Sequence, residues 1–155
     1  MKLLRSLLPY LAGLMAMGLV SFAIEALGHR LFPPSPEMAR AIQLLQAGDP
    51  AGIEAMRAAL PTVPAASFVC VLVAWILGAV AMVWVAVAVA ANRMGNRTAE
   101  DCRRKGLRMG IVLTLACASN LISLPHPVWM WPAGLLLPFA AALGTGRMLA
   151  RRATA

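Results

Sequence analysis

The sequence predicts an all-α membrane protein: a four-transmembrane-helix bundle with a short helical extracytoplasmic segment between helices 1 and 2. Three observations predict it. The 155 residues are 61% hydrophobic and 13% charged, whereas soluble domains average about 45–50% apolar and about 25% charged residues. The apolar residues form uncharged runs of bilayer length, because a helix rises about 1.5 Å per residue and the hydrocarbon is about 30 Å thick. The 14 Lys and Arg residues fall mostly between these runs, as in membrane proteins.

The first span is predicted at about 6–27, because residues 6–24 carry no charge. A basic start with Lys2 and Arg5, followed by small residues around Phe22, also fits a secretory signal peptide. The apolar run is longer than the about 7–15 residues usual in a signal peptide. We therefore expect an uncleaved anchor.

The second span is predicted at about 66–91. Residues 58–92 are uncharged, but Pro61 and Pro64 interrupt the beginning of this stretch, since proline lacks the N–H that a helix requires. The remainder is long enough for one tilted transmembrane helix.

The third and fourth spans are predicted at about 107–124 and about 128–148. Together they are too long for one helix, and the sequence SLPHP at 123–127 separates them, because proline keeps its preceding residue out of the helical region. Pro132 falls in the first turn of the fourth span, where it is tolerated, and Pro138 is expected to kink that span.

The distribution of basic residues predicts that both termini are cytoplasmic. Lys and Arg near the ends of spans are retained in the cytoplasm, and eleven of the fourteen lie at the N-terminus, around the loop between spans two and three, or around and after the end of span four. The other side holds three, Arg30, Arg40 and Arg57. The sequence therefore predicts a multi-pass membrane protein with its N-terminus and C-terminus in the cytoplasm.

The extracytoplasmic segment, about 34–61, carries signals for two short helices. Ser35 and Pro36 form a helix start, Gly48 a helix end, and Asp49 with Pro50 a second start. Each predicted helix has one apolar face, which would lie in the membrane interface or cap the bundle. This segment is interpreted as a structured lid without a ligand or as a partner-binding surface.

Four polar residues are candidates for a functional cluster near the outer face: Glu25, His29, Asn120 and His126. Ionisable groups in a span are costly and often functional, and Glu25 lies four residues before His29, on the same helical face. Three interpretations stay open. Glu25 pairs with Arg30 or reaches water; Glu25 and His29 handle a proton or ion; or the carboxylate and imidazoles bind a metal.

Small residues on the spans predict close helix packing, since lipid supplies no hydrophobic force between helices. The positions are Gly13, Gly18, Ala74, Gly78 and Gly134. They serve packing within one bundle or association of two copies.

The basic residues also indicate partners. The lipid bilayer is the first, and anionic lipid headgroups are expected at Arg97, Arg103, Arg104, Lys105 and Arg108. No nucleic acid is expected, because nucleic-acid binders gather their basic residues on one face of a soluble fold.

Known catalytic signatures and metal or cofactor motifs are missing from the sequence. It contains no nucleophile elbow, zinc-protease helix, phosphate loop or dinucleotide fingerprint. Its cysteines, Cys70, Cys102 and Cys117, have no paired spacing. We therefore expect no catalytic residues, cofactor or metal.

Two segments, EALGHRLFPP at 25–34 and AWILGA at 74–79, resemble small uncharacterised four-span proteins of bacterial inner membranes. The resemblance implies this setting and no activity. The working hypothesis is a non-enzymatic bundle that acts as an interaction or assembly component. The alternative is a small transporter or channel with a proton- or ion-handling Glu25/His29 pair.

Overall fold

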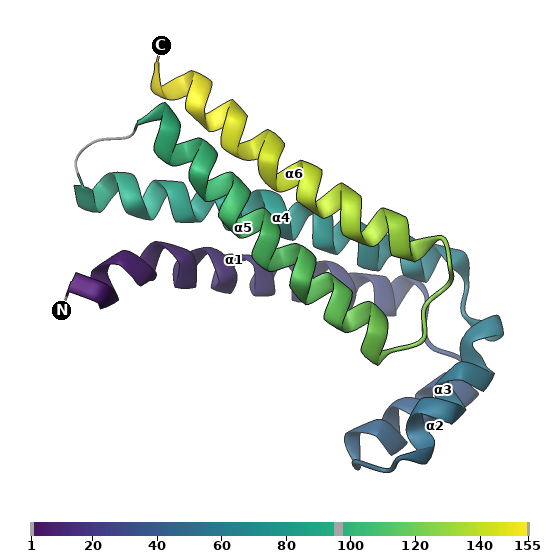
Figure 1. The fold of residues 1–155 in the computed structure, drawn as a ribbon. Coiled ribbons are helices and arrows are strands. Elements are labelled where there is room, and N and C mark those ends of the chain that lie inside the picture. The colour runs from purple at the N-terminus through teal and green to yellow at the C-terminus, as the bar shows by residue number, and fades with distance from the viewer. Residues whose placement is uncertain (1, 95–97, 155) are drawn as a thin grey trace.

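The computed structural model describes residues 2–94 and 98–154, and within them it is all-α. Figure 1 shows four long helices packed as a bundle and a short helical hairpin at one end. This confirms the predicted fold class. The helices are α1 (Lys2–Leu31), α2 (Pro36–Gln46), α3 (Ala51–Ala59), the 3₁₀ helix η1 (Leu60–Thr62), α4 (Ala65–Met94), α5 (Ala99–Ser123) and α6 (Met130–Ala153).

Four helices are long and apolar enough to cross a membrane, which makes the chain a multi-pass membrane protein. Their apolar spans are Ser6–Leu31, Ala65–Asn92, Ala99–Ser123 and Met130–Ala153. A helix satisfies its own backbone hydrogen bonds, which is required wherever lipid replaces water.

The four long helices of the described residues each extend beyond the span expected from hydropathy at one end or at both. α1 continues through Gly28 to Leu31, past the expected end at about 27. α5 begins at Ala99, before the expected start at about 107, because the Thr98 hydroxyl accepts a hydrogen bond from the Asp101 N–H at 3.1 Å. Such a cap, with acidic residues in the first turn, stabilises a helix start that hydropathy does not reveal.

α4 is the central helix of the bundle. It packs against α1 on one side and against α5 and α6 on the other, and α5 and α6 pack on each other. α1 is the peripheral helix: 11% of its most apolar stretch is buried, against 33–39% in the other three. Figure 1 shows both termini at one end of the bundle and the α2–α3 hairpin at the other.

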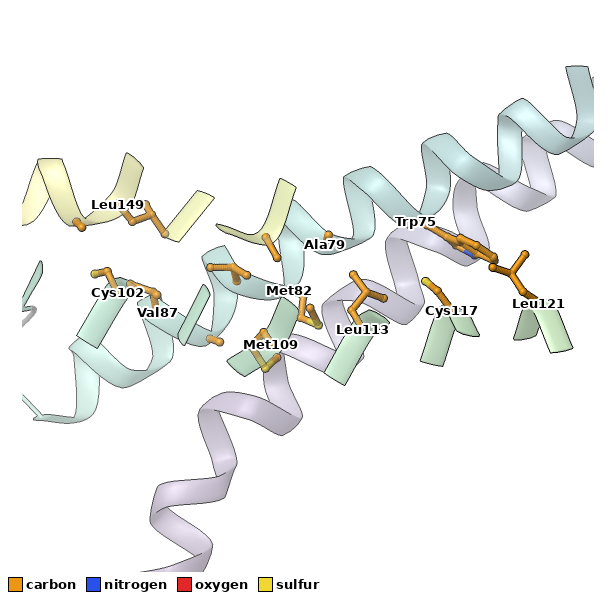
Figure 2. Packing of buried hydrophobic residues seen from close by; sticks show 14 of the residues in the cluster. Trp75, Ala79, Met82, Val87, Cys102, Met109, Leu113, Cys117, Leu121 and Leu149 are labelled. Atoms are coloured by element: carbon orange, nitrogen blue, oxygen red, sulfur yellow. The ribbon is translucent and has the colours of Figure 1, made fainter. Parts of the chain in front are cut away.

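The core lies between α4, α5 and α6. Figure 2 shows side chains of α4 facing side chains of α5, with Leu149 of α6 beside them. The residues recur every three or four positions, the spacing of one helical face. They include Trp75, Ala79, Met82 and Val87 from α4 and Cys102, Met109, Leu113, Cys117 and Leu121 from α5.

The hairpin folds from its own turn residues. The Ser35 hydroxyl accepts a hydrogen bond from the Met38 N–H at 3.2 Å and caps α2. Hydrogen bonds from its own backbone N–H and from Ser35 lower the pKa of Glu37, so this residue keeps a negative charge at the positive end of α2. Gly48, with φ +73°, ends the helix in the left-handed conformation.

Candidate functional site: a cavity between the hairpin and the bundle

A cavity of about 260 Å³ lies where the hairpin meets the bundle. Four parts of the chain form its wall: the end of α1 with the residues after it, the hairpin with η1, the start of α4, and the loop between α5 and α6. These parts are far apart in the sequence. The cavity therefore exists only in the assembled fold.

Three of the four residues predicted to cluster line this cavity: Glu25, His29 and His126. Asn120 does not. It is exposed on α5, because the core-facing positions of that helix near its end are Cys117 and Leu121.

Among the described residues that line the cavity, Glu25 is the only acidic one and none is Lys or Arg. The side chain is half-buried. Within residues 2–94 and 98–154, no ion pair or hydrogen bond joins Glu25 to His29 or to Arg30. The structure thus places the carboxylate beside the imidazole on one helical face without direct contact between them.

Gly28 fixes the distance of this helix end from α4. A Cβ atom at Gly28 would lie 3.1 Å from the Cys70 Cβ atom, which is closer than ordinary van der Waals contact. The small residue lets α1 approach α4 between Glu25 and His29, and Cys70 itself lines the cavity.

His126 is held in a fixed orientation. Its Nδ1 atom lies 2.8 Å from the Leu124 carbonyl oxygen, which can only accept, so Nδ1 donates. In the neutral ring this leaves Nε2 as an acceptor. The rings of Phe68 and Trp75 each lie 6.4 Å from the imidazole, centroid to centroid.

The rest of the wall is mainly apolar and was not identified as a site from the sequence. Phe32, Phe68, Met38 and Met56 contribute to it. A signal was present, since each predicted short helix has one apolar face, but the sequence does not show what that face covers. In the structure, part of the apolar face of α2 and part of the apolar face of α3 line the cavity.

The predicted packing residues lie mostly in contacts within the chain. Gly13, Gly78 and Gly134 each leave no room for a Cβ atom against a neighbouring helix. Ala74 is fully buried, and its carbonyl oxygen accepts a hydrogen bond from the Ser21 hydroxyl at 3.2 Å. Gly18 is exposed, with no atom of a neighbouring helix within 4 Å of its Cβ position.

The predicted lipid-contacting residues differ in exposure. Arg103, Arg104 and Arg108 are exposed; Arg104 pairs with Glu100 at 2.7 Å, and Arg108 donates a hydrogen bond to the Tyr10 hydroxyl at 3.1 Å. Lys105 is 8% exposed. Arg97 lies outside the described residues.

No group of three His, Cys, Asp or Glu side chains in residues 2–94 and 98–154 is arranged to hold a metal ion.

Comparisons with known proteins give no match to a protein family, a curated protein or a solved structure.

Proposed function

We propose that the protein is a non-enzymatic interaction component of a bacterial inner membrane, and that it holds a small ligand in the cavity between the hairpin and the bundle. The observation that carries this proposal is the composition of the cavity wall. Because the hairpin, α1, α4 and the α5–α6 loop all contribute, one occupant would contact all of them. A ligand there would couple the hairpin to the membrane bundle.

The proposed orientation puts both termini in the cytoplasm and the hairpin on the outer side. Two observations support it. Basic residues are concentrated near the termini, around the junction of α4 and α5 and in the first half of α5, which favours the cytoplasm. The end of α4 and the start of α5 lie at the same end of the bundle as both termini (Figure 1). Exposed Arg103, Arg104 and Arg108 would then contact anionic headgroups of the inner leaflet.

Filling the cavity is expected to remove its occupant. Ser67 is a half-buried residue of the cavity wall, so Ser67→Trp would place an indole in the space. Native mass spectrometry of protein purified in mild detergent is expected to show a bound small molecule on the wild type and its loss from Ser67→Trp.

Ser119→Trp is the matched control, because Ser119 is exposed on α5 and does not line the cavity. It should retain the bound molecule. The same small molecules on all three proteins would contradict the proposal.

Assembly with another membrane protein or a second copy is a further part of this proposal. Most of the predicted packing residues are used within the chain, but Gly18 remains open on the lipid-facing side of α1, beside the exposed Met15, Leu19 and Phe22. A glycine between large side chains lets another helix approach closely in lipid. We place the assembly surface there.

A second candidate, a small transporter or channel, is favoured by the shared placement of Glu25, His29 and His126 in one cavity. A carboxylate and imidazoles can pass a proton between them. This candidate predicts proton or cation flux in proteoliposomes that Glu25→Ala abolishes. Flux that is equal in protein-containing and empty vesicles would reject it and leave the interaction role in place.

A further inference from the structure

We propose that the cavity binds an organic ammonium ion, meaning a small apolar molecule that carries one positive charge. This inference rests on the proposed ligand-binding role of the cavity and adds the chemical class of the ligand. It is drawn from the charge of the wall, the hydrogen-bonding capacity of its polar groups and the nature of its apolar surface.

The charge of the wall selects for a cation. The chain has a net charge of +8, yet no Lys or Arg side chain that the structure describes lines the cavity, whereas Glu25 does. The carboxylate has no ion-pair partner among the described residues, although His29 on the same helical face acts on it electrostatically without contact. A cationic ligand supplies that partner, while an anion would be brought against an unpaired negative charge.

The polar groups of the wall reinforce this preference. An ionised carboxylate only accepts hydrogen bonds. His126 directs its Nδ1 proton to the Leu124 carbonyl oxygen at 2.8 Å, which leaves an acceptor at Nε2 in the neutral ring. The Ser35 hydroxyl is already engaged with Thr62 at 2.9 Å and with the Met38 N–H at 3.2 Å. Among these groups, the carboxylate and the His126 Nε2 atom therefore offer acceptors to a ligand that carries donors or positive charge.

The apolar wall favours an organic cation over a metal ion. Divalent metals such as Ca²⁺ require about six to eight oxygen ligands, and no metal-holding group of side chains occurs in residues 2–94 and 98–154. Phe32 and Phe68 line the cavity together with Met38 and Met56. Aromatic faces attract ammonium groups, and methionine side chains adapt to the shape of an apolar body.

Two compounds of nearly the same shape test the inference on the unaltered protein. Benzyltrimethylammonium and neopentylbenzene differ in one atom, the charged nitrogen against a neutral carbon. Binding is measured by equilibrium dialysis with the protein in nanodiscs of neutral lipid, and empty nanodiscs correct for partition into the bilayer. We expect the cation to saturate one site per chain and to bind about tenfold or more tightly than the neutral compound.

Glu25→Gln keeps the shape of the side chain and removes its charge. It is expected to weaken binding of the cation by about tenfold and to leave binding of neopentylbenzene unchanged. Glu54→Gln is the matched control, because Glu54 is exposed on α3 and does not line the cavity; its affinity for the cation should equal that of the wild type.

Equal affinity of wild type and Glu25→Gln for benzyltrimethylammonium would overturn the inference, as would tighter binding of the neutral compound by the wild type. In either case, loss of the co-purified molecule from Ser67→Trp would still support the cavity as a binding site. Failure of both compounds to bind, together with an unchanged bound molecule in Ser67→Trp, would overturn both proposals.

Discussion

Replacing Gly13 by alanine is expected to separate α1 from α4 and to destabilise the protein by about 1–3 kcal/mol, the usual cost of overpacking a close contact. A Cβ atom at Gly13 would lie 2.6 Å from the Met82 carbonyl oxygen and 3.2 Å from the Ala86 Cβ atom. The carbonyl belongs to the backbone of the central helix, so it cannot rotate away. The free energy of unfolding, measured by SDS titration in mixed micelles, is expected to fall.

Gly18→Ala is the control on the same helix, since no atom of a neighbouring helix lies within 4 Å of the added methyl group. Alanine also has the higher helix propensity, by about 1 kcal/mol in a helix interior in water. The stability of the Gly18→Ala variant should therefore equal or exceed that of the wild type. Equal stability of the two variants would show that α1 does not approach α4 as closely as the structure indicates.

Gly106→Ala and Gly146→Ala are each expected to destabilise the contact between α5 and α6 by about 1–3 kcal/mol. A Cβ atom at Gly106 would lie 2.9 Å from the Ala142 carbonyl oxygen, and one at Gly146 would lie 2.9 Å from the Cys102 carbonyl oxygen. Each would also lie 3.0 Å from the Cα atom of the other glycine. The two backbones are thus in direct contact.

The double variant tests this shared contact. Once the first methyl group has separated the helices, the second meets less resistance, so the double variant should lose less stability than the two single losses combined. Gly144→Ala is the control, because Gly144 is exposed and its added methyl group would meet no atom of a neighbouring helix within 4 Å. Additive losses, or a loss in Gly144→Ala as large as in Gly146→Ala, would contradict the described contact.

These glycines show how much of the helix packing can be predicted from the sequence. Gly13, Gly18, Gly78 and Gly134 were all singled out as small residues in spans, yet Gly18 has no neighbouring helix within 4 Å of its Cβ position. Gly106 lies before the expected start of the third span and was not identified. A glycine marks a place where helices are able to approach, but which faces meet depends on how all the helices are arranged.

Part of the candidate site could likewise be predicted from the sequence, and part could not. Glu25 and His29 are four residues apart, so they lie on one helical face if the helix continues through Gly28. This follows from local sequence alone. His126 reaches the same cavity because the loop between α5 and α6 ends beside the start of α4, where Phe68 packs against the imidazole. Asn120 is close to His126 in the sequence but is exposed, since its position on α5 faces away from the core.

The long helices, the short helices between α1 and α4, and the breaks at proline and glycine can all be predicted from the sequence alone. These follow from local physics: apolar runs of bilayer length must form helices in lipid, and turn residues act on their immediate neighbours. The central position of α4, the peripheral position of α1, and the cavity lined by the Glu25 carboxylate are known only from the folded structure. These depend on contacts between residues far apart in the chain, whose geometry is set by close packing of whole helices.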